Sequence, residues 1–333
     1  MGVKITGFGH YIPEQRVTNA ELSARFGVSE EWIVEKTGIM ERCYAASTEA
    51  TSDLIVPAAR QCLAKAGVSP AAVECILVAT MTPDQSCPST AAIVQQQLGA
   101  ANAWGFDLMA ACSGFLYALQ VGAALINAGT HRTVLVCAAD KMSSIIDPQD
   151  RKTTLIFADG AGACLLQYSA TENQVVDTIC RLDSTCYADI VVPAGGSRLP
   201  ITEKLVAEGE QYLRFVSRTI STDAVRLLRQ VMLDFLGKHG LTFADLDFII
   251  PHQANKRMLE ALATDLGLPI EKFIINIEHL GNTSAATIPV AISQALQNGQ
   301  LHGQETLLLA SVGAGYTYAA SLIHLNLSAH AHY

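Results

Sequence analysis

The sequence predicts an α/β protein built from two repeated halves, with helices and sheets alternating in five layers. Half of its 333 residues are hydrophobic and 16% are charged, which is enough apolar material for large cores. Residues 67–79 (GVSPAAVECILVA) and 240–252 (GLTFADLDFIIPH) also align without a gap. Both segments end in strands that are apolar along their whole length, and such strands need helices on both faces of their sheet.

The similarity between the halves extends on both sides of these segments. Each segment follows a helix-like run, at residues 53–66 and 223–239. Further on, each half contains a second apolar helix and a second apolar strand, at 131–140 and 304–313. Chance similarity of two αβ units is the alternative, but four matching elements in one order argue against it. We expect an N-terminal half at residues 1–170 and a C-terminal half at 171–333.

Composition excludes several classes of protein. A net charge of −9 argues against a nucleic-acid binder. No apolar run is long enough to span a membrane, and the first residues lack the apolar stretch of a signal peptide. The nine cysteines are odd in number and form no C-x-x-C pair, which favours reduced thiols and a cytoplasmic location.

Metal and nucleotide signatures are weak. No zinc-type spacing is present, so we expect no metal site, and the HAHY terminus is expected to be a frayed tail. The glycine-rich segment ADGAGA lacks the full dinucleotide-binding pattern, so a nicotinamide-binding protein is a poor alternative.

The segment DLMAACSGFLYAL places Cys112 where an apolar run ends and a helix begins. The unpaired N–H groups and the positive end of a helix favour a thiolate at this position. The sequence therefore suggests a nucleophile, although a buried structural cysteine is the commoner explanation for a single residue.

Three other strand ends carry groups that complement a nucleophile. His252 follows the apolar strand of the second half, and Asn282 lies in a Gly-Asn turn before a helix. The turn Gly313-Ala314-Gly315 follows the next strand, and its glycines allow backbone N–H groups to approach a ligand. Each feature alone has a structural explanation, but the repeat is expected to bring these turns to one centre, as a base or donor, an amide donor and an oxyanion hole.

At these residues the sequence resembles the thiolase-fold condensing enzymes, and most closely the β-ketoacyl-acyl-carrier-protein synthase III family. The resemblance covers nearly the whole chain. It is carried by the motifs RVTNAEL, EEWIVEKTGI, AACSGFLYAL, DPQDRKTTLIFADGAGA, PHQAN and GNTSAAT, in the order of the family. It implies a thiolase-like fold for the five layers.

The resemblance implies a role for each matching residue. Cys112 would carry the acyl group, with His252 and Asn282 completing the catalytic triad. The N–H groups of Cys112 and Ala314 would form the oxyanion hole. The other implied roles are an adenine sandwich for coenzyme A by Trp32 and Arg151, a pantetheine contact by Asn255, carrier-protein docking by Lys256 and Arg257, and closure of the partner subunit's acyl pocket by Cys87.

The implied reaction is acyl transfer from an acyl thioester to Cys112, followed by decarboxylative Claisen condensation with a malonyl-carrier thioester in fatty acid biosynthesis. The substrates would be thioesters of coenzyme A or an acyl carrier protein, with no further cofactor. The family also implies a homodimer, for which we expect two apolar strands per subunit, near TVLVCAAD at 133–140, to join one continuous sheet across the two-fold axis.

Some positions depart from the family pattern and keep an alternative open. Lys36 and Met40 stand where the family often has arginine, Lys152 replaces a glycine, and residues 209–225 are longer than the matching family segment. We expect all of them near the tunnel mouth, where they disfavour acetyl-coenzyme A as the primer. The alternative is a ketosynthase of secondary metabolism, of polyketide, quinolone or alkylresorcinol type. Such an enzyme condenses or cyclises longer β-ketoacyl thioesters, or transfers acyl groups to oxygen.

Since Cys87 is smaller than the phenylalanine that shortens this pocket in the family, we expect a medium-to-long acyl chain.

Overall fold

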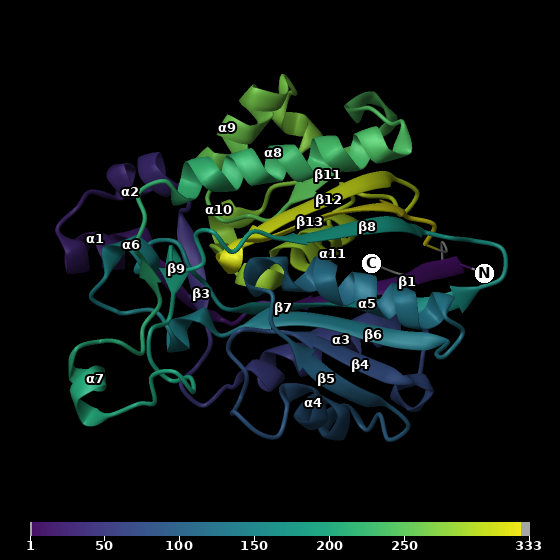
Figure 1. Cartoon of the computed structure of the whole chain (residues 1–333), viewed down its shortest axis with the longest axis horizontal. Coiled ribbons are helices and arrows are strands. Elements are labelled where there is room, and N and C mark those ends of the chain that lie inside the picture. The colour runs from purple at the N-terminus through teal and green to yellow at the C-terminus, as the bar shows by residue number, and fades with distance from the viewer. Residues whose placement is uncertain (1, 328–333) are drawn as a thin grey trace.

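The computed structural model describes residues 2–327, and these form five alternating layers of helix and sheet (Figure 1). Two sheets lie roughly parallel to each other with two helices between them. Two further helices cover the outer face of each sheet. This confirms the predicted thiolase-like arrangement, while the HAHY terminus lies outside the described residues.

The first sheet has five strands and belongs to the N-terminal part of the chain. Its outer strand pairs on the β1 side are antiparallel, whereas β4 pairs in parallel with both β5 and β6. In spatial order the strands are β1 (Gly2–Tyr11), β7 (Gly160–Ser169), β6 (Thr133–Asp140), β4 (Cys75–Ala79) and β5 (Trp104–Leu108).

The second sheet repeats this pattern with four strands. In spatial order they are β11 (Phe248–Pro251), β12 (Thr306–Gly313), β13 (Thr317–His324) and β8 (Val175–Leu182). The counterpart of β5 is reduced to one parallel bridge between Ile249 and Phe273. The sequence repeat is therefore a structural repeat, with its fifth strand nearly lost in the second half.

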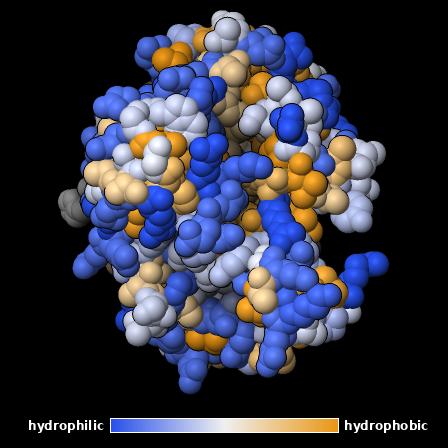
Figure 2. Space-filling model, turned by 90° about the vertical axis from the view of Figure 1, so that its left-hand side faces the viewer, coloured by the Kyte–Doolittle hydropathy of each residue, from blue (hydrophilic) through white to orange (hydrophobic). Residues whose placement is uncertain are grey.

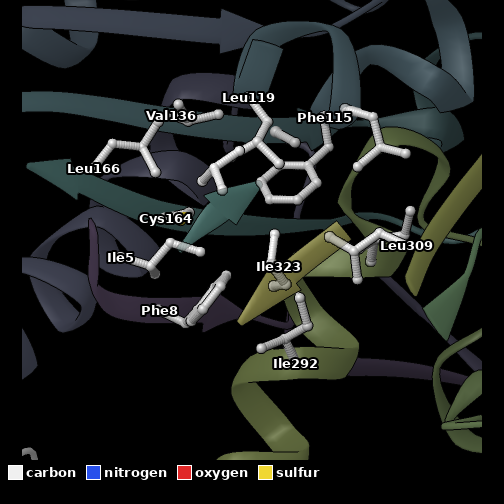
Figure 3. Packing of buried hydrophobic residues seen from close by; sticks show 14 of the residues in the cluster. Ile5, Phe8, Phe115, Leu119, Val136, Cys164, Leu166, Ile292, Leu309 and Ile323 are labelled. Carbon is white, nitrogen blue, oxygen red and sulfur yellow. The ribbon is translucent and has the colours of Figure 1, made fainter. Parts of the chain in front are cut away.

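The middle layer consists of α5 (Gly114–Asn127) and α11 (Thr287–Gln297). Most of their residues are buried, because both helices are in contact with strands on either side. Figure 3 shows this core, in which Phe115 and Leu119 of α5 and Ile292 of α11 pack among side chains from both sheets. This cluster joins the two halves into one hydrophobic core.

The outer layers are α3 (Thr51–Ala66) and α4 (Thr90–Leu98) on the first sheet, and α8 (Ile220–His239) and α9 (Lys256–Leu266) on the second. The equivalent helices α3 and α8 both end at a glycine in the left-handed conformation, Gly67 with φ 65° and Gly240 with φ 64°. Glycine adopts this conformation without steric cost, so both repeats stop their helix in the same way.

Smaller elements gather at one end of the layers, on the left of Figure 1. A two-stranded ribbon of β2 and β3 lies beside four short helices, and residues 183–219 add a second ribbon of β9 and β10 with α7. Their bounds are β2 (Gln15–Thr18), α1 (Asn19–Phe26), α2 (Glu30–Thr37), β3 (Glu41–Tyr44), α6 (Arg151–Thr154), β9 (Ile190–Val191), α7 (Glu203–Ala207), β10 (Arg214–Phe215) and α10 (Ile277–Leu280).

The strand TVLVCAAD lies inside its sheet, so it is not itself a strand that could join a partner's sheet. This strand is β6, which pairs with β4 on one side and β7 on the other. The edge strands of this sheet are β1 and β5, and on β5 the Trp104 side chain is about half exposed, at 49%. The completely apolar sequence of β6 reflects its central position, because a central strand is covered on both faces.

All nine cysteines are free thiols in the structure. Within residues 2–327 no helix combines the length and the apolar character needed to cross a membrane.

We predict that Phe115→Ala lowers the free energy of unfolding by about 3–5 kcal/mol, because it removes a fully buried ring from the core between the sheets. Urea unfolding followed by circular dichroism measures the effect. Leu233→Ala on the exposed side of α8 is the control and should cost about 0.5 kcal/mol or less. Equal losses for the two variants would show that Phe115 is not a central packing residue.

Candidate active site

A pocket of about 520 Å³ opens at the end of the layers where the small elements gather. Cys112, His252, Asn282 and Ala314 line its inner part. Its outer part is lined by α2, α6 and the segment before α8, and the molecular face that carries these elements is hollowed in Figure 2, with hydrophobic and hydrophilic residues around the hollow. The volume lies within the range of small-molecule sites.

Cys112 lies in a single 3₁₀ turn, residues 111–113, between β5 and α5. The preceding residue, Ala111, has a φ of 46°, a left-handed conformation that is costly for a residue with a side chain. The Cys112 sulfur lies 3.5 Å from the hydroxyl oxygen of Ser284. The predicted strand-to-helix position is therefore present.

Burial works against the expected thiolate. Burial raises the pKa of the Cys112 thiol to about 12, and the nearby Asp140 carboxylate adds to this increase. Desolvation of the sulfur outweighs the contribution of the helix end. The thiol is therefore the stable form of Cys112 at physiological pH.

His252 is almost completely buried, and its pKa is lowered by this burial to about 3. The imidazole is therefore neutral at physiological pH. Its Nδ1 atom lies 2.8 Å from the Thr287 hydroxyl, while Nε2 is buried with no hydrogen-bond partner in the structure. A buried polar atom without a partner costs stability, so Nε2 is the group that is best suited to meet a substrate oxygen.

The Thr287 hydroxyl and the Ser284 backbone both influence which imidazole nitrogen carries the proton. The Thr287 hydroxyl oxygen lies 2.8 Å from His252 Nδ1 and 3.1 Å from the Ser284 carbonyl oxygen, and it has a single proton to donate. When Thr287 donates to Nδ1, Nε2 carries the imidazole proton and is a hydrogen-bond donor. When Thr287 donates to the carbonyl, Nε2 is an acceptor.

Asn282 is buried, and its side-chain orientation follows from one contact. The Ser284 N–H donates to Asn282 Oδ1 at 2.8 Å. Because an N–H can only donate, this bond fixes the carbonyl side of the amide. The NH₂ group of Asn282 is then the part that remains for a ligand in the pocket.

The glycine turn after β12 approaches the nucleophile closely. A Cβ atom on Gly313 would lie 2.7 Å from the Cys112 nitrogen, so only glycine allows this contact between the two turns. Ala314 follows directly and lines the pocket beside Cys112. The predicted oxyanion-hole residues therefore meet at one place, at the ends of β5 and β12.

Trp32 and Arg151 face each other across the pocket mouth. The guanidinium carbon of Arg151 lies 5.5 Å from the centre of the Trp32 ring, in a cation–π contact. An adenine held between them would need about 7 Å, since stacked atoms lie about 3.5 Å apart. The two side chains are brought together as predicted, but the space between them is closed in the free protein.

The residues that begin α9 already have partners. The Asn255 side chain caps the helix by accepting from the Arg257 N–H at 2.8 Å, and it donates to the Lys36 carbonyl. Lys256 forms an ion pair with Glu278. Arg257 forms an ion pair with Glu260 and also donates to the Glu35 carbonyl, so part of its guanidinium group already has partners within the chain.

Two residues named from the sequence lie away from the pocket of this chain. Cys87 is exposed in the loop before α4, and Met40 is exposed beside Arg257 rather than at the pocket mouth. Met40 therefore does not line the pocket, because it follows the end of α2 at Thr37. Lys36, Lys152 and Leu213 of the segment 209–225 do line the pocket.

Sequence reasoning missed two polar residues beside the nucleophile. Ser284 contacts Cys112, and Asp140 lies buried next to Ser284 at the end of β6. Ser284 lies inside the GNTSAAT motif and could have been found there. Asp140 follows a central strand, and nothing in its local sequence distinguishes it from a structural residue. Within residues 2–327 no group of three or more potential metal-ligating side chains is present.

Known protein families match both halves of the chain. The model described as 3-oxoacyl-[acyl-carrier-protein (ACP)] synthase III matches residues 106–184, and the model of its C-terminal region matches residues 236–325. A beta-ketoacyl-[acyl-carrier-protein] synthase III of Koribacter versatilis is 43% identical, covering 96% of this chain and 97% of the relative.

Solved structures give the same result. The 3-oxoacyl-[acyl-carrier-protein] synthase III of Aquifex aeolicus VF5 has a TM-score of 0.88 and 36% identity, covering 97% of this chain and all of that one. The priming beta-ketosynthase of the R1128 polyketide pathway has a TM-score of 0.89 and 32% identity, and the match covers 98% of this chain and 97% of that one. The chain therefore belongs to the 3-oxoacyl-[acyl-carrier-protein] synthase III family, whose members are condensing acyltransferases of fatty acid biosynthesis.

Proposed function

We propose that Cys112, His252 and Asn282 are the catalytic triad of this synthase. Cys112 takes an acyl group from a thioester, and a malonyl-carrier thioester then condenses with it. One observation carries this proposal. The side chains of residues 112, 252 and 282 come from separate turns and line one pocket, and the backbone of Gly313 lies close to the Cys112 nitrogen beside them.

In the first step the Cys112 sulfur attacks the carbonyl carbon of the bound thioester. The negative charge that develops on the carbonyl oxygen takes hydrogen bonds from the N–H groups of Cys112 and Ala314. Each such donor contributes about 3 kcal/mol in a site that excludes water. The donor thiol leaves, and the acyl group stays on Cys112.

In the second step the malonyl thioester loses carbon dioxide and becomes an enolate. His252 Nε2 and the Asn282 amide donate hydrogen bonds to the enolate oxygen. This role needs a neutral imidazole with its proton on Nε2, and the pKa of about 3 together with donation by Thr287 to Nδ1 would supply it. The carbanion attacks the acyl carbon and releases the Cys112 sulfur. Thioester chemistry of this kind needs no other cofactor.

The substrates are thioesters of coenzyme A and an acyl carrier protein. The adenine of coenzyme A would separate Trp32 from Arg151 and stack between them. For an acidic carrier, Lys152 and Arg218 at the pocket mouth are better placed than Arg257. Neither side chain forms an ion pair within the described residues.

A homodimer is supported by the exposed edge strand. The β5 strand has one unpaired edge, and beside it Trp104 and Met109 are 49% and 75% exposed. Pairing of two β5 strands would cover these side chains and join the sheets of both subunits. The free cysteines fit a reducing compartment such as the cytoplasm.

We predict that Cys112→Ala abolishes the mass increase that the intact protein shows after incubation with acyl thioesters. His252→Ala and Asn282→Ala should still be acylated, but should condense about 10²–10³-fold more slowly because they lack an oxyanion donor. Mass spectrometry and a condensation assay separate these steps. An acylated Cys112→Ala protein would disprove the assignment of the nucleophile.

We predict that the double variant Lys152→Glu/Arg218→Glu raises the KM for a carrier-protein thioester about tenfold or more at low salt. The effect should shrink with added salt, because exposed charges are screened. A pantetheine thioester without carrier should be used with nearly unchanged KM. Lys204→Glu on α7, away from the pocket, is the control. An equal rise in KM for this control variant would show that the carrier protein does not dock at Lys152 and Arg218.

We predict that the enzyme prefers medium-to-long acyl donors and that Cys87→Phe shifts this preference toward shorter chains. Each additional buried methylene favours binding by about 0.8 kcal/mol where the pocket is long enough. Acylation of Cys112 across a chain-length series measures the shift. Cys186→Phe, at another exposed cysteine, is the control. Preference for acetyl donors and an unchanged profile would contradict the prediction.

A further inference from the structure

We propose that Ser284 and Asp140 form a proton relay that takes the thiol proton of Cys112 during acylation and returns it after condensation. This inference rests on the proposed role of Cys112 as nucleophile. It assigns the proton transfer to two residues outside the triad.

The Ser284 hydroxyl occupies the place that a relay requires. Its oxygen is 3.5 Å from the Cys112 sulfur, and no other side chain of residues 2–327 is hydrogen-bonded to that sulfur. Ser284 is fully buried and has a φ of 54°. Ser284 and Ala111 are the two non-glycine residues with positive φ in the described chain, and they flank Cys112 from opposite halves. Such strain persists where the surrounding structure enforces it.

Asp140 offers one oxygen for a proton. Its Oδ1 atom accepts hydrogen bonds from the Thr80 hydroxyl at 3.0 Å, the Met81 N–H at 2.8 Å and the Thr82 hydroxyl at 3.2 Å. Its Oδ2 atom accepts one long bond, from the Ala285 N–H at 3.4 Å. The Ser284 hydroxyl donates to the Met81 sulfur at 3.8 Å and also interacts with this carboxyl group, whose Oδ2 faces the Ser284 turn through the Ala285 N–H. Oδ1 is saturated with donors, so the proton from Ser284 would bind to Oδ2.

The surroundings suit a group that accepts a proton for a short time. Burial raises the pKa of the Asp140 carboxyl, which makes it a stronger base than an exposed aspartate. The Cys112 thiol is the titratable group that faces it. The end of β4 and the turn at Ser284 contribute only hydroxyl and amide groups. The neighbouring Lys141 directs its ammonium group to the Ala46 carbonyl.

The relay leaves His252 free for the second substrate. Its neutral imidazole is held by Thr287, and its Nε2 atom is needed as an oxyanion donor in condensation. A separate acceptor for the thiol proton means that this donor does not have to change its protonation between the two steps.

The protons balance over the cycle. In acylation the thiol proton moves to Ser284, and the Ser284 proton moves to Asp140. The new sulfur–carbon bond forms as the donor thiolate leaves and takes a proton from solvent. In condensation the bond to carbon dioxide breaks, the carbanion bonds to the acyl carbon, and Cys112 leaves as a thiolate. Asp140 then returns its proton through Ser284.

Single-turnover acylation of Cys112, followed by mass spectrometry from pH 6 to pH 10, tests the relay. Asp140→Asn should slow acylation about 100-fold or more at pH 7, the usual effect of losing a general base. This deficit should shrink at least tenfold toward pH 10, because solvent removes the proton directly and because the loss of the Asp140 charge favours the thiolate. Asp140→Glu should recover part of the rate.

Matched variants separate the relay from a structural role. Ser284→Ala and Ser284→Gly should both be slow, although glycine relieves the backbone strain. Asp159→Asn removes another buried carboxylate, which is bonded to Ser143 and Ala45, and should acylate within about threefold of the wild type.

Several results would overturn the relay. These are an unchanged rate in Asp140→Asn, a deficit that stays constant with pH, and a normal rate in Ser284→Gly. If Asp140→Asn does not fold, the two Ser284 variants carry the same test. Failure of the wild-type protein to become acylated at Cys112 would instead refute the proposed function.

Discussion

The packing of α5 and α11 between the two sheets is the constraint on which the site depends. Both helices are held in place by apolar side chains from both sheets. The Cys112 turn leads directly into α5, and the Asn282–Ser284 turn leads directly into α11. Burying these helices side by side therefore brings together two turns that are about half the chain apart. The apolar core sets the position of the polar centre.

This arrangement has a cost in backbone strain and in buried polar groups. Ala111 and Ser284 adopt left-handed conformations, and His252 Nε2 is buried without a hydrogen-bond partner among residues 2–327. Each of these features is of order 1–3 kcal/mol. The surrounding core can enforce them because it is continuous across both halves. The strained residues Ala111 and Ser284 belong to the two turns that bring the Cys112 sulfur, the backbone N–H groups and the Asn282 amide together.

The dry centre affects the two chemical steps in opposite ways. Burial disfavours the Cys112 thiolate and raises the thiol pKa to about 12, although a helix begins there. The same exclusion of water strengthens the hydrogen bonds that stabilise an oxyanion and keeps His252 neutral. In the proposed mechanism the site would thus favour the charge of the transition states over the charge of a resting Cys112 thiolate. Deprotonation becomes the step for which neighbouring groups matter most.

The sequence by itself determined the repeat, the buried strands and the four turns that carry Cys112, His252, Asn282 and Ala314. These follow from local patterns, because apolar runs, glycine turns and short motifs are written in neighbouring residues. The division of the chain between residues 170 and 171, like the roles of the site residues, stays a prediction.

Only the tertiary structure decided which strands are at the sheet edges, that Trp32 and Arg151 close on each other, and that Met40 lies outside the pocket. It also placed Asp140 and Thr287 beside the site and set the direction of the Cys112 pKa shift. Those features depend on desolvation and on neighbours distant in sequence, and no local pattern encodes them.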